Sequence, residues 1–203
     1  MAIFSYRTIQ SPTTGIYKEK GSKFLAFAYP AESEPDIKNH LELLKKEYFD
    51  ARHHCFAYVL GADRKKFRAF DDGEPNHSAG DPILGQIRSK ELTNVLVIVV
   101  RYFGGTKLGV GGLISAYKTA AEDALSKAVV IEQEVLKDIV ITYDYTSTPE
   151  VMRLVKELEL QIRGQKFEQR CSLAAAYKLR HETLLHEKIA LLKATGHDIS
   201  TEG

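Results

Sequence analysis

The sequence predicts an α+β protein of two domains, residues 1–130 and 131–203. Segments with strand-like and helix-like hydrophobic spacing alternate along the first domain. The longest apolar run, residues 95–100, is typical of a strand at the centre of a sheet that is covered on both faces. Beyond the boundary the pattern restarts in the order strand, helix, strand, strand, helix, which suggests a small ferredoxin-like module.

The first domain is predicted to begin with strands and then alternate. Ser33 is a suitable N-cap for a helix, and Pro35 and Asp36 suit its first turn. A short helix follows Pro82, and a longer helix is expected over residues 113–128. Strands are expected over residues 5–10, 15–17, 23–29, 54–60 and 94–101. Residues 61–80 read as one long, charged, turn-rich loop.

The second domain shows the same two kinds of spacing. A strand is expected over residues 135–145, and a helix begins at Thr148. Residues 161–180 read as a hairpin that turns near Gln169. A last helix carries Leu185, Ile189 and Leu192.

Composition excludes several classes of protein. A net charge of +1 over 203 residues means that any nucleic-acid binding must come from a local patch. Two distant cysteines make neither a disulfide framework nor a zinc site, so Cys55 and Cys171 are expected to be buried thiols. The start lacks a charged segment before an apolar run, and no run is long enough for a bilayer, so the cytoplasm is the expected compartment.

The most specific local feature is a glycine-rich turn, residues 104–112, between the apolar strand and the long helix. A helix start exposes unpaired backbone N–H groups and the positive end of the helix dipole, and glycines allow an anion close to that backbone. P-loop and dinucleotide motifs do not fit. Val110 stands where a P-loop needs lysine, and Ile114 stands where the dinucleotide motif needs glycine. A tight turn packed on the sheet is the alternative. The candidate phosphate-binding residues are Arg101, Gly104, Gly105, Lys107, Gly109, Gly111 and Gly112.

A short basic run is a second candidate for nucleic-acid contact. Cations here alternate with the aromatic residues Phe67 and Phe70, which suits phosphate attraction and base stacking. A solvated loop is the alternative. The candidate residues are Arg64, Lys65 and Lys66.

Two polar clusters complete the set of candidates. Neighbouring carboxylates could hold a divalent cation or make turns, and no EF-hand spacing is present. Adjacent histidines on a strand point to opposite faces, and no third group orients a Cys–His pair. We therefore predict no metal, no cofactor and no assigned catalytic residue. The clusters contain Arg52, His53 and His54, then Asp71, Asp72, Glu74, His77 and Ser78.

Three segments together resemble the YigZ/IMPACT family. They are residues 51–55, residues 71–75 with 79–80 and 82, and residues 99–105 with 108–109, 111–113 and 116–117. The resemblance implies an N-terminal domain like domain IV of elongation factor G and a ferredoxin-like C-terminal domain. It also implies a link to translation, which the eukaryotic members regulate within the amino-acid-starvation kinase pathway. One departure is His77, where the family usually has glycine.

The predicted function is a non-catalytic, translation-related binding protein. It would contact RNA, the ribosome or a translation-associated protein through the glycine turn, with residues 64–66 steering, and no membrane is involved. The alternative is an enzyme acting on a small anionic or phosphorylated substrate, with His53, Asp72 or Glu74 moving protons. A third possibility is a protein–protein adaptor. An enzyme needs a pocket where these groups converge, whereas a nucleic-acid binder needs a broad basic face.

Overall fold

The structure is a computed structural model that describes residues 2–203. The chain divides into two compact units. The N-terminal unit comprises residues 6–133, and the C-terminal unit comprises residues 134–203 together with the first few described residues, 2–5. None of the helices within the described range is long and apolar enough to cross a membrane.

A five-stranded antiparallel sheet forms the N-terminal unit, with its strands in the order β2-β3-β6-β4-β5. Alternate side chains of the central strand β6 enter two different hydrophobic cores, one on each face of the sheet. The prediction of a central strand covered on both faces is therefore confirmed. The strands are β2 Thr13–Glu19, β3 Ser22–Pro30, β4 His53–Leu60, β5 Lys66–Phe70 and β6 Val95–Tyr102.

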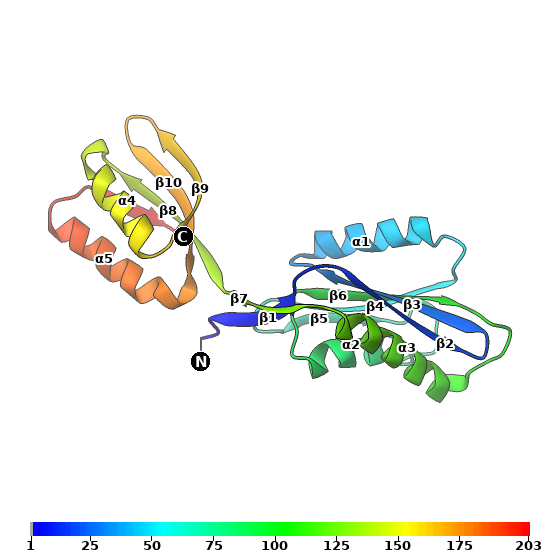
Figure 1. Ribbon diagram of the computed structural model, residues 1–203. Coiled ribbons are helices and arrows are strands. Elements are labelled where there is room, and N and C mark those ends of the chain that lie inside the picture. The colour runs from blue at the N-terminus through cyan, green and yellow to red at the C-terminus, as the bar shows by residue number, and fades with distance from the viewer. Residues whose placement is uncertain (1) are drawn as a thin grey trace. The chain divides into compact units, whose positions relative to one another are not determined.

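Three helices cover this sheet. Helix α1 (Glu34–Glu47) lies on one face, and α2 (Gly80–Ser89) and α3 (Gly109–Ser126) lie on the other (Figure 1). The predicted cap of α1 is confirmed, because Ser33 and Asp36 form a capping box.

Three details of the N-terminal unit differ from the sequence prediction. Strand β5 lies inside the segment expected to be one loop; it is an edge strand with exposed residues, so its hydrophobic pattern is weak. A small two-stranded sheet pairs β1 (Ser5–Ile9) with β7 (Val130–Glu134), and β7 was not predicted. Helix α3 begins at Gly109, four residues earlier than predicted, because its first turn is built from the residues that read as a glycine turn.

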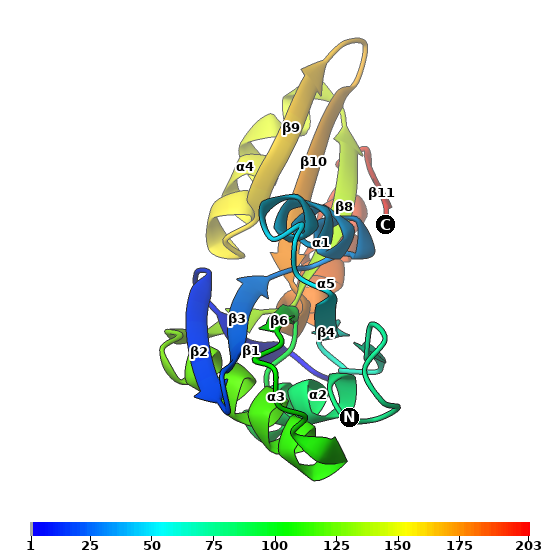
Figure 2. The ribbon, with the colours of Figure 1, turned by 90° about the vertical axis from the view of Figure 1, so that its right-hand side faces the viewer.

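The C-terminal unit is a four-stranded antiparallel sheet in the order β11-β8-β10-β9. Helices α4 and α5 share one core with one face of this sheet, and Figure 2 shows β9, β10 and β8 side by side. The predicted hairpin is confirmed, while the short, polar last strand was missed. The elements are β8 Leu136–Tyr143, α4 Thr148–Glu157, β9 Gln161–Phe167, β10 Cys171–Lys178, α5 Glu182–Ala194 and β11 Ile199–Glu202, with 3₁₀ turns η1 Tyr145–Ser147 and η2 Leu179–His181.

Candidate functional site

An open pocket of about 450 Å³ lies where the connection from β6 to α3 meets the start of β4. This size falls in the range of about 300–1,000 Å³ that is usual for small-ligand sites. We call it the turn pocket. It brings His53 and Glu74 together with part of the glycine turn, but Asp72 does not line it. Its lining residues are Arg52, His53, Glu74, Pro75, Arg101, Phe103, Lys107, Leu108, Gly109, Val110 and Leu113.

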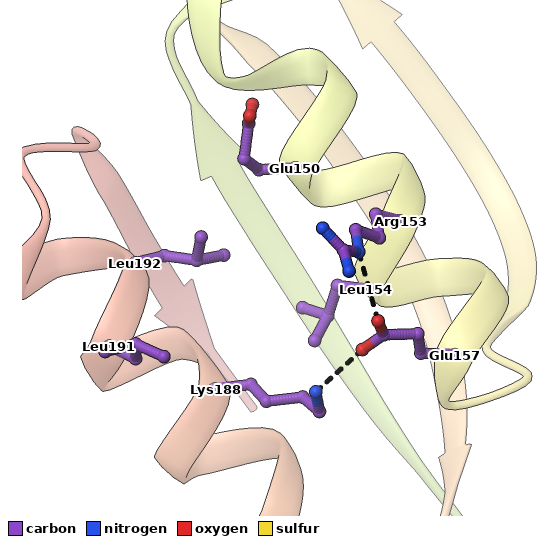
Figure 3. Close-up of a pocket in the computed structure, with 7 residues that line it drawn as sticks. All are labelled: Glu150, Arg153, Leu154, Glu157, Lys188, Leu191 and Leu192. Atoms are coloured by element: carbon purple, nitrogen blue, oxygen red, sulfur yellow. Dashed lines mark hydrogen bonds and ion pairs between the residues drawn. The ribbon is translucent and has the colours of Figure 1, made fainter.

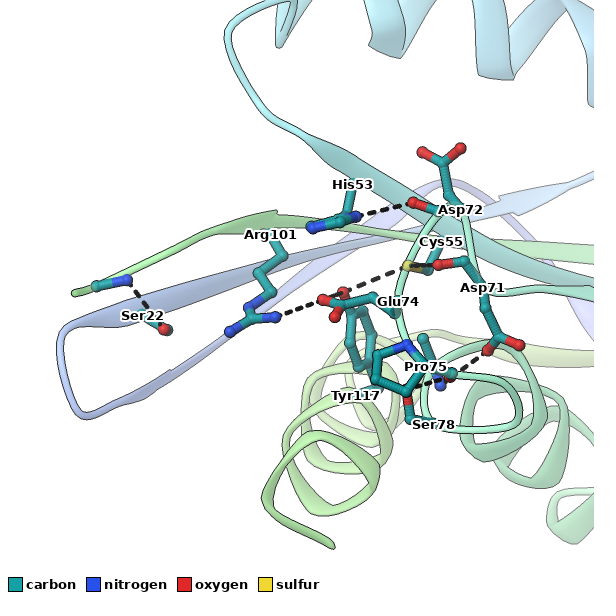
Figure 4. Close-up of polar contacts among 12 residues, drawn as sticks. Ser22, His53, Cys55, Asp71, Asp72, Glu74, Pro75, Ser78, Arg101 and Tyr117 are labelled. Carbon is teal, nitrogen blue, oxygen red and sulfur yellow. Dashed lines mark hydrogen bonds and ion pairs between the residues drawn. The ribbon is translucent and has the colours of Figure 1, made fainter. Parts of the chain in front are cut away.

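A buried ion pair borders the turn pocket. Nη1 of Arg101 donates to Oε1 of Glu74 at 2.6 Å, and the two side chains are only 8% and 4% exposed. The hydroxyl of Tyr117 donates to the same carboxylate oxygen at 2.7 Å (Figure 4). Arg101 is therefore not a free surface cation, contrary to the expectation that it adds uncompensated charge to the glycine turn.

Cys55 lies beside this ion pair. Its Sγ is 3.0 Å from the carbonyl oxygen of Asp71 and 3.3 Å from the hydroxyl oxygen of Tyr117. Burial raises the pKa of the Cys55 thiol, so the thiolate needed by a nucleophile is disfavoured. Both cysteines of the chain are free and buried, as the sequence predicted.

The two neighbouring histidines have different surroundings. Nδ1 of His53 lies 2.8 Å from the carbonyl oxygen of Asp72. Because a carbonyl only accepts, Nδ1 carries the hydrogen of this contact, and Nε2 is the other ring nitrogen (Figure 4). His54 is buried, and desolvation lowers its pKa. The carboxylate of Asp72 accepts the backbone N–H of His54 at 2.7 Å, so this carboxylate is used in fixing the loop.

Asp71 closes the N-terminus of α2. Its Oδ1 accepts the N–H groups of Ala79 at 3.0 Å and Gly80 at 2.8 Å, and its Oδ2 accepts that of His77 at 2.9 Å. Burial alone would raise the pKa of Asp71, but these hydrogen bonds hold it below its ordinary value. The acidic cluster thus serves as turn and cap chemistry. In the described part of the chain, no group of three or more His, Cys, Asp or Glu side chains could hold a metal ion.

His77 and Ser78 belong to the same loop and lie outside the turn pocket. His77 has a φ of 65°, a left-handed conformation that glycine adopts most easily. Its Nδ1 lies 2.6 Å from Oδ2 of Asp81, while the hydroxyl of Ser78 donates to the carbonyl of Pro75 at 2.6 Å. These contacts stabilise the loop and bring neither polar group to the pocket.

The basic run is separate from the turn pocket. It follows the far end of β4, about 23 Å along the strand from His53 at about 3.3 Å per residue. Nζ of Lys65 lies 3.7 Å from Oδ2 of Asp63, and Nζ of Lys66 lies 3.2 Å from Oε1 of Glu34. Residues 64–66 therefore lie at the other end of the strand from the glycine turn, and two of them are paired with acids. Their role in steering RNA stays a prediction.

The start of α3 is open to solvent at the turn pocket. No side chain caps this helix, and its first turn contains no acidic residue. Its first N–H groups thus lack a capping partner. Lys107 and Arg52 are exposed beside it, and neither is paired with a carboxylate within residues 2–203.

Two glycines fix the path of the chain into this helix. A Cβ at Gly104 would lie 1.9 Å from the carbonyl carbon of Gly21, so only glycine fits there. The N–H of Gly104 donates to Oγ of Ser22 at 3.1 Å, which makes it unavailable to a ligand. Gly109 has a φ of 74°, which favours glycine.

A protein-family model, the Impact N-terminal domain, matches residues 20–125. The chain belongs to the IMPACT family. IMPACT family member YvyE of Bacillus subtilis (strain 168) is 30% identical over 161 residues, 79% of this chain and 74% of the relative. IMPACT family member YigZ of Escherichia coli (strain K12) is 29% identical over 94% of this chain and 91% of its own. A solved crystal structure described as a hypothetical protein superposes with a TM-score of 0.78 at 26% identity, covering 98% of this chain and 97% of that one.

In this IMPACT family member, sequence reasoning assigned no role to several residues in or beside the turn pocket. Tyr117 was named only within a segment that resembles the family, whereas its hydroxyl also donates to Glu74, which lines the pocket. Phe103 and Val110 are 55% and 52% exposed at the pocket. Two large apolar side chains exposed next to a glycine turn were the available signal.

A second groove lies between α4 and α5 of the IMPACT chain and has a volume of about 270 Å³ (Figure 3). Its charges compensate one another, because Glu157 pairs with Arg153 at 3.1 Å and with Lys188 at 2.7 Å. It therefore offers less free charge than the turn pocket. The lining residues are Glu150, Arg153, Leu154, Glu157, Lys188, Leu191 and Leu192.

Proposed function

We propose that this IMPACT family member is a non-catalytic, cytoplasmic binding protein that acts in the regulation of translation and contacts RNA phosphate through the turn pocket. The observation that carries the proposal is the uncapped start of α3 beside two unpaired cations, Lys107 and Arg52. A helix N-terminus carries partial positive charge and free N–H donors, which favour phosphate. Family membership supplies the link to translation, which the resemblance of the three segments implies.

The groups in the pocket favour binding over catalysis. Oε1 of Glu74 accepts from both Arg101 and Tyr117, so this carboxylate oxygen already holds two structural hydrogen bonds. Cys55 is held as a thiol. His53 alone has a nitrogen available for proton transfer, and a general base usually works with further positioned groups.

One observation favours the second candidate, an enzyme for a small phosphorylated substrate. His53 and Glu74 both line the turn pocket, as an active site would require. Incubation with a panel of phosphate monoesters and assay of released phosphate separates the two. Turnover that is lost on His53→Gln supports the enzyme, and binding without turnover supports the binding protein.

Titration of RNA binding against salt tests the leading proposal. For single strands the logarithm of affinity falls with the logarithm of salt with a slope of about −0.7 per neutralised phosphate, so two cations predict about −1.4. Lys107→Ala should make this slope less steep by about 0.7. Flat or absent RNA binding at low salt removes the RNA branch and leaves the ribosome or a translation-associated protein, which a pull-down from lysate would detect.

For the fold, we infer that residues 134–203 form a ferredoxin-like sandwich. The strand order β11-β8-β10-β9 with two helices sharing one core supports this inference. The likeness of the N-terminal unit to domain IV of elongation factor G, and the split of the chain at residue 130, stay predictions. Limited proteolysis that cuts between residues 129 and 135 while leaving both halves intact would support the split.

A further inference from the structure

We infer that the turn pocket binds a single nucleotide by its phosphate monoester, either as a free nucleoside monophosphate or as the 5′-phosphorylated end of an RNA. The inference rests on the proposed function, because it takes the turn pocket as a binding site, and it adds which kind of phosphate the pocket accepts.

The cations that line the turn pocket are enough to bind one phosphate group. Proteins that follow a nucleic-acid backbone use a groove with cations along its length. Here the unpaired cations Lys107 and Arg52 line one pocket, while residues 64–66 lie at the other end of β4. Outside the pocket, the exposed Lys20 and Lys23 lie on the β2–β3 hairpin, whose turn packs against Gly104. A terminal phosphate needs only the two cations that line the pocket.

The charge of the pocket matches a monoester better than a diester. Because Glu74 cancels Arg101, the free charge comes from Lys107, Arg52 and the start of α3, which adds about half a positive charge. A phosphate monoester, with a second pKa of about 6, carries close to two negative charges at neutral pH, whereas a diester carries one. The monoester therefore gains more from the same groups.

A buried donor supplies evidence independent of the helix. Arg101 is 7% exposed and lines the turn pocket. Its Nε–H has no acceptor anywhere among the described residues. Buried donors are almost always satisfied in folded proteins, so an unsatisfied donor beside a pocket marks a place where an acceptor would be stabilised. Nε has almost no accessible surface, so a phosphate oxygen in the pocket reaches it only after a small movement of the Arg101 side chain.

The apolar side of the pocket suits a base. Phe103 and Val110 are both more than half exposed there. An exposed aromatic ring can stack on any base, which every nucleotide provides. The Arg101 guanidinium lies 5.8 Å from the centre of the Phe103 ring, which helps to hold the ring in place. A phosphate site with an adjoining stacking surface describes a nucleotide.

Fluorescence anisotropy with 3′-labelled RNA oligonucleotides of one sequence, with or without a 5′-phosphate, tests the inference. We expect the phosphorylated oligonucleotide to bind about ten-fold more tightly, and AMP to compete far better than adenosine. Competition by AMP equal to that of an unlabelled 5′-phosphorylated RNA identifies the free nucleotide as the ligand, and much weaker competition identifies the RNA end. Equal affinity of the two oligonucleotides, with AMP no better than adenosine, overturns the inference.

Surface variants tie this preference to the pocket without disturbing the core. Lys107→Ala should weaken AMP binding about ten-fold, and Phe103→Ala should weaken AMP but leave inorganic phosphate unchanged. Lys118→Ala is the matched control: it removes the same charge from the exposed side of α3, about 14 Å along the helix from Gly109, and should have no effect. Equal losses in the Lys107 and Lys118 variants would overturn the assignment.

The result also separates the inference from the proposed function. RNA binding that does not depend on the 5′-phosphate, with no competition by AMP, contradicts the inference but is consistent with the RNA-binding proposal. AMP binding without RNA binding supports the nucleotide site and contradicts the proposal that the protein contacts RNA.

Discussion

The N-termini of α2 and α3 belong to the same unit, but the free N–H groups at the two helix starts have opposite surroundings. At α2, the carboxylate of Asp71 accepts backbone N–H groups around the first turn. At α3, no side chain caps the helix, no acid lies in the first turn, and the flanking residue Lys107 adds positive charge. The end of α2 is therefore saturated by the protein itself, whereas the end of α3 has its positive potential free for an external anion.

The one carboxylate beside the start of α3 does not change this difference. Glu74 lines the turn pocket, but its Oε1 accepts hydrogen bonds from Arg101 and Tyr117. The charge of Glu74 is thus matched by a buried cation, and the cations at the pocket rim stay uncompensated. Variants that add or remove carboxylates at these two helix ends test whether the ends differ in this way.

The largest effect is expected from Glu74→Gln, which removes the counter-charge of a buried arginine. Breaking a buried ion pair by one partner typically costs about 3–5 kcal/mol, because the other charge stays buried and uncompensated. Urea denaturation should show this loss in the free energy of unfolding. Glu42→Gln is the control, since the exposed pair of Glu42 with Lys38 should contribute at most about 1 kcal/mol.

The same variant should bind anions more tightly. Without Glu74, Arg101 becomes a third uncompensated cation at the turn pocket. A rise in affinity for AMP together with a fall in stability would show that Glu74 limits the free charge of the pocket. A variant with unchanged affinity would mean that Arg101 does not contribute to the pocket's potential.

How much of this difference could be read from the sequence depends on how local each contact is. The cap of α1 was predictable, because Ser33 and Asp36 lie three residues apart and form a known pattern. The exposed, glycine-rich start of α3 was predictable for the same reason, because its residues are consecutive in the sequence. The role of Arg101 was not, since its partner Glu74 lies 27 positions away and only the folded sheet brings them together. The cap by Asp71 likewise joins residues across a loop, so the sequence indicated turn chemistry there but not which N–H groups the carboxylate accepts.

The next variant concerns the start of α2, where Asp71 accepts the backbone N–H groups. Asp71→Asn replaces an acceptor-only carboxylate by an amide whose NH₂ group faces backbone N–H donors. We expect a loss of about 1–2 kcal/mol in the free energy of unfolding at pH 7, the usual range for a lost helix cap. Urea denaturation measures it, and Asp63→Asn, on an exposed side chain outside any helix end, serves as the control.

The pH dependence of this loss follows from the direction of the pKa shift. The folded pKa of Asp71 is below its unfolded value of about 3.9. Its stabilising contribution is therefore fully present above that value and is lost as the pH falls through the folded pKa. The gap between wild type and Asp71→Asn should be constant from pH 7 to about pH 5 and should narrow below about pH 4. A gap that does not change at low pH would show that the charge of Asp71 plays no part in the cap.

The smallest effect on stability is expected from giving α3 a carboxylate like the one that α2 has. Val110 is 52% exposed in the first turn of α3 and lines the turn pocket, so Val110→Asp places an anion at the free helix end without displacing core atoms. An acid in a first turn stabilises a helix by about 0.3–1 kcal/mol, so the free energy of unfolding should rise, while binding of AMP should fall because the site then carries its own anion. Val110→Asn has nearly the size and polarity of the aspartate variant but no charge, so the difference between the two variants measures the effect of the added anion. Opposite changes in stability and binding are expected only if the start of α3 is where the external anion binds, because a carboxylate at an unrelated surface point would alter neither. If Val110→Asp binds AMP as well as wild type does, the two helix ends do not differ in the way proposed.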